Sequence, residues 1–275
     1  MSLAVSNIAW APDEELAMAR LLEELAVTEV ELAPTKVFPD PLAVTDTALK
    51  THLAIWSDHG IRVRAFQSLL FGHADLALFG EPESRAAMSS RVEGFIELAG
   101  RMGATALVFG SPRNRRVPEG MGSAEADDIA VEFFGRLGAV ASRNGTWLCI
   151  EPNPTAYDCN YVTDAAAGRL LVERVGVQGF GLHLDAAGMA LAGDDPGESI
   201  RSSAHVLRHF HVSAPQLGEI EQEVVDHAAA AAALEAVGFD GAVSIEMRSG
   251  QPGENEHRVR SAVAIARRHY GRAGG

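Results

Sequence analysis

Eight short apolar or β-branched segments recur along the 275-residue chain, and amphipathic stretches separate them. Strands show a period of two residues, whereas amphipathic helices show spacings of three and four. The predicted strands are Ala4–Ile8, Thr28–Leu32, Ile61–Gln67, Ala104–Phe109, Thr146–Glu151, Gly179–Asp185, Leu207–Ser213 and Ala242–Glu246. The predicted helices include Pro12–Ala26, Glu83–Arg101, Ala124–Arg143, His227–Val237 and Glu254–Arg268.

Regular alternation of strands and helices favours a parallel sheet, and eight such units in about 250 residues are typical of a closed (β/α)8 TIM barrel. The alternative is an open doubly wound sheet, which usually has a glycine-rich turn after its first strand. Residues 7–12, into which the first predicted strand runs, contain no glycine. No linker or low-complexity segment divides the chain. We therefore predict an α/β protein with a single barrel domain over residues 1–275.

Charge and composition narrow the possible partners. The chain has 37 acidic and 23 basic side chains, for a formal net charge of -14. Nucleic-acid-binding proteins usually have a basic surface, so we expect no nucleic acid partner and favour a small molecule. No apolar run reaches the roughly 18 residues of a membrane span, and no signal peptide is evident. With only two cysteines, Cys149 and Cys159, a cytoplasmic location is expected.

Polar residues end four consecutive predicted strands, at the end of the barrel where active sites of this fold lie. They are Glu151, Asp185, His211 and Glu246. Strand alternation directs all four into the barrel and their apolar neighbours towards the helices. Three adjacent carboxylates repel one another unless a cation lies between them. Three carboxylates and an imidazole suit Mn²⁺, Mg²⁺, Co²⁺ or Zn²⁺, so we predict one divalent ion bound by these four residues.

Several segments resemble the xylose-isomerase-like TIM-barrel superfamily, and more narrowly its sugar phosphate isomerase/epimerase branch, which includes the ketose 3-epimerases. They are residues 150–154 (IEPNP), 183–185 (HLD), 209–213 (HFHVS) and 238–246 (GFDGAVSIE). The resemblance covers essentially the whole chain and is most specific over residues 146–248. It implies a metal-dependent isomerase or epimerase of a sugar, polyol or sugar phosphate, with the same four metal ligands. It also implies that Glu151 and Glu246 act as acid and base around a metal-stabilised enediolate.

Two positions depart from the ketose 3-epimerases. Those enzymes usually have a substrate-contacting histidine three residues after the metal-binding aspartate, where this chain has Gly188. They also have an arginine in the loop after the metal-binding histidine, and residues 213–219 contain none. The metal ligands are therefore present while two substrate contacts are absent, which leaves the substrate open.

Other polar residues near the same end of the barrel are candidates for binding substrate. The predicted substrate-binding residues are His183, Arg113, Asn153, Tyr157 and Gln67. The alternative for His183 is a buried structural role. Arg113 belongs to the basic loop 110–116, which suits a phosphate or carboxylate group, and the favoured alternative is a solvated loop or a subunit contact. Asn160 and Glu31 are further candidates, with capping or supporting roles as the alternative.

Three other functions are alternatives for this sequence. A dehydratase (lyase) would use the same metal and bases. An abasic-site endonuclease would need further histidine ligands at the earlier strand ends, and the second and third strand ends have none. A non-catalytic sugar-binding barrel would not need both glutamates. The resemblance also suggests a homodimer.

Overall fold

Eight parallel strands form a closed barrel in which each strand pairs with the next in the chain and β8 pairs with β1. The computed structural model describes residues 1–220 and 224–271, so residues 221–223 and 272–275 of the predicted domain 1–275 lie outside the described residues. The strands are β1 (Ser2–Ser6), β2 (Glu29–Leu32), β3 (Arg62–Phe66), β4 (Ala106–Phe109), β5 (Trp147–Ile150), β6 (Phe180–Asp185), β7 (Leu207–Ser213) and β8 (Ala242–Glu246). The predicted (β/α)8 TIM barrel is confirmed.

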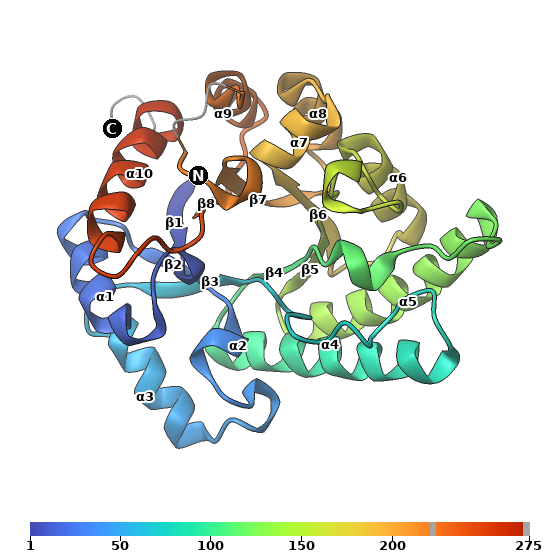
Figure 1. Cartoon of the computed structure of the whole chain (residues 1–275), viewed down its shortest axis with the longest axis horizontal. Helices are drawn as coiled ribbons and strands as arrows, with labels where there is room; N and C mark the ends of the chain where they lie inside the picture. The colour runs from blue at the N-terminus through green and yellow to red at the C-terminus, as the bar shows by residue number, and fades with distance from the viewer. Residues whose placement is uncertain (221–223, 272–275) are drawn as a thin grey trace.

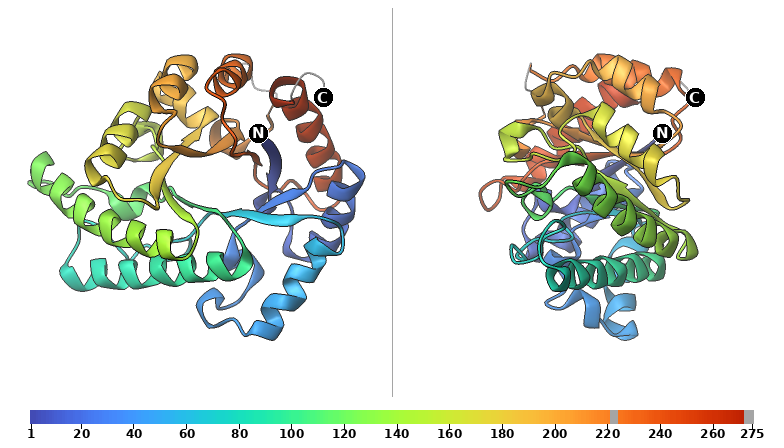
Figure 2. Two further views of the ribbon diagram at one scale, coloured as in Figure 1. Left: turned by 180° about the vertical axis from the view of Figure 1, so that it is seen from behind. Right: turned by 90° about the vertical axis from the view of Figure 1, so that its right-hand side faces the viewer.

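Helices surround the strands, as Figure 1 shows. They are α1 (Glu15–Glu24), α2 (Pro34–Val37), α3 (Asp46–Ser57), α4 (Pro82–Met102), α5 (Ser123–Arg143), α6 (Ala165–Val175), α7 (Ala186–Ala192), α8 (Pro196–Ser203), α9 (His227–Ala236) and α10 (Asn255–Tyr270). Helices α4 and α5 run side by side (Figure 2). Helices α1 and α10 are neighbours, and Arg260 of α10 donates to Glu24 of α1 at 2.8 Å, so the two ends of the chain complete the outer layer.

The predicted strands match the observed ones within two residues at each end. The largest error is in the first strand, which was predicted to reach Ile8 but ends at Ser6. The Ser6 hydroxyl accepts a hydrogen bond from the Ile8 N–H at 3.5 Å and caps a 3₁₀ turn. The first predicted helix was also too long, because Pro12–Glu14 forms a 3₁₀ turn before α1 begins at Glu15.

The apolar core lies between the barrel and the helices. Leu182, Leu184, Phe210 and Val212 are at most 1% exposed and belong to it, which confirms that alternate residues of β6 and β7 face outward. Small side chains occupy part of the interior, where Ala65, Ala106 and Cys149 form a separate buried cluster. We infer that these small side chains leave space for the histidines of β6 and β7. Among the described helices, none is long and apolar enough to cross a membrane.

Candidate metal centre and active site

Strand register brings the predicted ligands together at the C-terminal end of the barrel. Asp185 lies opposite His211 in the β6–β7 pair, and Ser213 lies opposite Glu246 in the β7–β8 pair. The Nδ1 atom of His211 is 3.4 Å from Oε2 of Glu246 and 3.9 Å from Oδ2 of Asp185. Glu151 follows β5 directly, and one ligand atom each from Glu151, His183, Asp185 and His211 lie within 4.8 Å of one another. The four predicted ligands therefore converge, and His183 joins them.

Glu31 of β2 orients the His211 ring through hydrogen bonds. The Nε2 atom of His211 lies 3.0 and 3.1 Å from the two carboxylate oxygens of Glu31, which is fully buried and also accepts a hydrogen bond from the Ser244 hydroxyl at 2.6 Å. Burial raises the pKa of Glu31, but the charges of His211 and His209 and these hydrogen bonds lower it to about 2. Metal-binding histidines almost always have such a partner on the second nitrogen. Glu31 thus has the supporting role rather than a free carboxylate for substrate.

The other nitrogen of His211 is available to a cation. Nδ1 is buried and forms no hydrogen bond with any described residue, although Glu246 lies 3.4 Å away. Both carboxylates are close enough to pair with a protonated ring, and a divalent ion at the same place would supply the positive charge in place of that proton. This buried nitrogen, surrounded by carboxylates, fits a divalent ion.

Two hydrogen bonds fix the Asp185 carboxylate. The Gly188 N–H donates to Oδ1 at 2.6 Å, which makes Asp185 the N-cap of α7, and the Ser213 hydroxyl donates to Oδ2. Gly188, which stands where the ketose 3-epimerases have a histidine, therefore contributes through its backbone.

Gly110 after β4 determines where the Glu151 carboxylate can lie. A Cβ atom at position 110 would be 2.2 Å from Oε2 of Glu151, so any side chain there would displace the carboxylate. The sequence predicts only that Gly110 lies in a loop. Its contact with Glu151 depends on how the loop packs in the folded barrel.

The charges of the site favour a bound cation. Burial, together with the negative charges of Glu246 and Asp185, raises the pKa of Glu151. Burial and the charge of Glu246 likewise raise the pKa of Asp185. Burial alone would lower the pKa of His211, but the charges of Glu31 and Glu246 hold it well above the usual 6.5. A divalent ion would neutralise the carboxylates and replace the proton on His211.

A cavity of about 330 Å³ opens next to this cluster. Glu151 and Glu246 both line it, together with Gln67, Arg113 and Leu217. Its volume is at the lower end of the range for small-molecule sites, which is about 300–1,000 Å³. The two predicted acid–base glutamates thus face one cavity with Gln67 and Arg113.

The other predicted substrate-binding residues are placed differently. The Tyr157 hydroxyl accepts a hydrogen bond from the Gln216 N–H at 2.9 Å, which joins the loop after β5 to the loop after β7. The Asn153 side-chain oxygen accepts a hydrogen bond from Arg115 at 3.0 Å. Asn160 pairs with both backbone groups of Val117 at 2.9 Å, so its side chain connects two loops.

Arg115 shows that the basic loop has two separate roles. Arg115 is fully buried and donates to the backbone oxygens of Glu151 at 2.7 Å, Tyr161 at 3.1 Å and Phe109 at 3.3 Å, as well as to Gly110. The interpretation of the whole loop as either anion-binding or solvated is therefore wrong for Arg115, which supports the backbone around Glu151. No sequence signal distinguished Arg115 from Arg113, because neighbouring arginines differ only in where the turn directs them.

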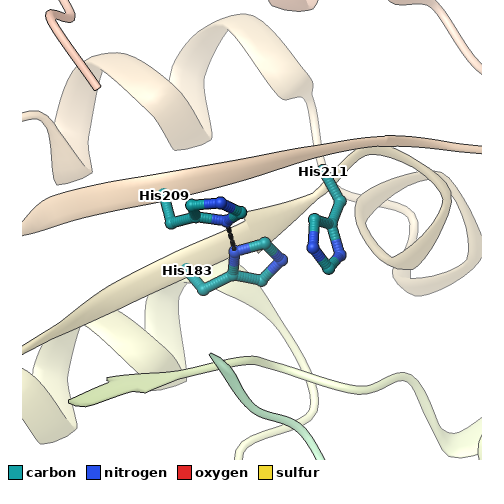
Figure 3. Close-up of side chains that lie close together, drawn as sticks. All are labelled: His183, His209 and His211. Atoms are coloured by element: carbon teal, nitrogen blue, oxygen red, sulfur yellow. Dashed lines mark hydrogen bonds between the residues drawn. The ribbon is translucent and has the colours of Figure 1, made fainter. Parts of the chain in front are cut away.

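His183 is fully buried beside His209 and His211 (Figure 3). Its ring centroid is 4.1 Å from that of His211 and 5.1 Å from that of His209. His183 therefore lies in the barrel interior, which agrees with the buried position considered for it from the sequence. Whether His183 contacts a substrate stays a prediction.

The fold and the site define a parallel (β/α)8 barrel with a carboxylate–imidazole cluster, suited to a cation, at the C-terminal ends of its strands. The chain belongs to the xylose isomerase-like TIM barrel family, whose sequence model matches residues 19–269. This membership confirms the resemblance found in the sequence. No curated protein is similar enough in sequence to match this chain.

Solved structures with the same fold include sugar epimerases. D-psicose 3-epimerase from Clostridium cellulolyticum H10, solved with D-tagatose, has a TM-score of 0.81 and 16% identity, covering 98% of this chain and 99% of its own. A 3-keto-D-glucoside 4-epimerase from E. coli has a TM-score of 0.81 and 17% identity, with 98% and 99% covered. The IOLI protein, solved with a bound zinc atom, has a TM-score of 0.77 and 16% identity, with 98% of each chain covered. At these identities the similarity establishes the fold.

Proposed function

We propose that this protein is a divalent-metal-dependent isomerase or epimerase of a sugar, polyol or sugar phosphate. The observation that carries the proposal is that a cluster of possible metal ligands lies next to a cavity. His211 Nδ1, which has no hydrogen bond with a described residue, faces the carboxylates of Asp185 and Glu246, and Glu151 and Glu246 line the adjacent cavity. The sugar epimerases of the same fold support this class of substrate. The predicted ligands are Glu151, Asp185, His211 and Glu246, with Mn²⁺, Mg²⁺, Co²⁺ or Zn²⁺ as the ion.

The chain's own residues supply the proton transfer. A bound divalent ion would polarise the substrate carbonyl and make the neighbouring C–H more acidic. In the proposed reaction one of the two glutamates, Glu151 or Glu246, removes that proton and the other returns a proton to the adjacent position or opposite face. Arg115 holds the backbone of Glu151, and Gly110 leaves space for its carboxylate.

Two residues of the cavity are proposed to select the substrate. Gln67 lines the cavity, and its Nε2 donates to Ser6 at 2.6 Å, so its side chain is fixed before substrate arrives. Arg113 is exposed, lines the same cavity, and has no ion pair or hydrogen bond with another described residue. An arginine of this kind is suited to a phosphate or carboxylate group. We expect Arg113→Gln to raise KM for a phosphorylated substrate, whereas Arg116→Gln, in the same loop but outside this cavity, should not.

The test is metal-dependent exchange of solvent deuterium into a panel of ketoses, inosose-type polyols and sugar phosphates. We expect exchange at a carbon next to the carbonyl in the metal-loaded protein, loss of exchange after chelation, and recovery on reloading. Glu246→Gln should abolish turnover while metal still binds, and Glu235→Gln, which alters an exposed carboxylate on α9, should not. If no metal can be loaded, or if Glu246→Gln keeps full turnover, the proposed function is refuted. A single domain over residues 1–275 and a homodimer stay predictions.

A further inference from the structure

Two additional imidazoles lie directly beneath the predicted metal ligands. His183 precedes Asp185 by two residues on β6, and His209 precedes His211 by two residues on β7, so both point into the barrel. Neither side chain is exposed to solvent. Figure 3 shows the His183 ring with one nitrogen bonded to His209 and the other turned towards His211.

A register irregularity creates this arrangement. Leu182 pairs with Leu207, but the next residue, His183, pairs with His209 and not with Arg208. The irregularity lies in the β6–β7 pair, between Leu182 and His183. Such bulges redirect side chains and are frequent next to active sites. Without the shift, His183 would face Arg208 rather than a second imidazole.

The hydrogen bond between the two rings determines which nitrogen of His183 is free. The Nδ1 atoms of His183 and His209 are 3.1 Å apart, so one of them carries the hydrogen and the other accepts it. A neutral imidazole has one donor and one acceptor nitrogen. When His183 donates from Nδ1, its Nε2 keeps a lone pair. That Nε2 is buried and has no hydrogen-bond partner among the described residues.

We propose that His183 is an additional ligand of the metal, bound through Nε2, and that His209 positions it by accepting its Nδ1 hydrogen. One ligand atom of His183 lies within 4.8 Å of those of Glu151, Asp185 and His211, so these four residues form a group that could hold one ion. Glu246 lies outside this tightest group and approaches His211 Nδ1 at 3.4 Å. The inference rests on the metal site of the proposed function and adds a residue to the four predicted ligands.

A second imidazole changes which ion the site prefers. Imidazole ligands suit Zn²⁺ and other late transition metals, whereas carboxylates and water suit Mg²⁺ and Mn²⁺. With His183 and His211 both bound, the site should favour Zn²⁺ or Co²⁺ over Mg²⁺. It follows that His183 sets the metal selectivity of the site.

The experiment measures the metal in the full chain and needs no substrate. Metal-free protein is loaded with Cu²⁺ as a paramagnetic probe, and pulsed electron paramagnetic resonance counts the coupled imidazole nitrogens. Two imidazoles are expected in the wild type and one in His183→Asn. Loss of a residue that only supports a metal ligand typically weakens metal binding by about 10–100-fold. Titration calorimetry should show a larger loss of Zn²⁺ affinity in His183→Asn, and a smaller change in Mg²⁺ affinity.

His227→Asn is the matched control, because His227 is also buried, at 5% exposure, but lies on α9 and bonds to Tyr270. This variant should keep two imidazoles and wild-type metal affinity. A single imidazole in the wild type would overturn the assignment of His183 and leave the proposed function intact. Failure of the wild type to bind any of Zn²⁺, Co²⁺, Cu²⁺, Mn²⁺ and Mg²⁺ would overturn both, whereas binding of Mn²⁺ or Mg²⁺ alone would overturn only the assignment of His183. The wild-type count decides the question even if His183→Asn does not fold.

Discussion

Gly110→Ala should remove activity while leaving the fold intact, because the added methyl group displaces only the Glu151 carboxylate. The new Cβ would lie 2.2 Å from Oε2 of Glu151, and such contacts essentially never fall below 3.0 Å. The carboxylate oxygen must therefore move by about 0.8 Å or more. Displacing a catalytic group by about 1 Å can cost about 100-fold in rate, which corresponds to about 2.7 kcal/mol.

The assay compares kcat/KM for deuterium exchange, metal affinity and thermal unfolding of Gly110→Ala with those of the wild type. We expect about a 100-fold loss of kcat/KM and weaker metal binding, with a free energy of unfolding within about 1 kcal/mol of the wild type. Gly135→Ala on α5 is the control, since a Cβ there meets no heavy atom within 4 Å. It should keep full activity and gain up to about 1 kcal/mol of stability. Full activity in Gly110→Ala would refute the argument that catalysis depends on the position of the Glu151 carboxylate.

Three further perturbations test the support around the site and the fold. Glu31→Gln should lower metal affinity by about 10–100-fold, measured by calorimetry, because His211 loses its charged partner; unchanged affinity would contradict that support. Arg115→Met should lower the free energy of unfolding by more than about 3 kcal/mol in urea titrations, because it leaves buried carbonyl oxygens unpaired; a loss below 1 kcal/mol would show that these bonds matter little. Burial lowers the pKa of His52, which accepts a hydrogen bond from Trp56, to about 4. Between pH 6.5 and 4 the unfolded chain therefore binds a proton at this histidine that the folded chain does not. As the pH is lowered from 6.5 to 4, the free energy of unfolding should decrease by about 3 kcal/mol. In guanidinium titrations the free energy of unfolding of His52→Gln should depend less on pH than that of the wild type. An equal pH dependence would disprove the contribution of His52.

The barrel could be predicted because strand and helix patterns are local. Each strand carries its own alternation, and residues such as Leu182 and Phe210 face the helices in the structure as the pattern indicates. The positions of Asp185, His211 and Glu246 followed from the same alternation and from where strands end in this fold. Local capping was not predicted, so the end of β1 was misplaced at the Ser6 turn.

Contacts between distant segments could not be read from the sequence. Glu31 and His211 are 180 residues apart, and only barrel closure brings β2 within reach of β7. The difference between Arg113, which lines the cavity, and Arg115, which is buried, depends on the path of one 3₁₀ turn. Neither fact leaves a periodic signal in the chain.

The sequence alone therefore determined the class of fold, the end of the barrel that carries the site and four polar residues that converge there, because these depend on local alternation and strand order. The tertiary structure decided the detailed chemistry. It placed His183 opposite His209 through a register shift, brought Glu31 within hydrogen-bonding distance of His211, and packed Gly110 next to the Glu151 carboxylate. These are distances between segments that only packing fixes, and they determine which nitrogen is free to hold a cation.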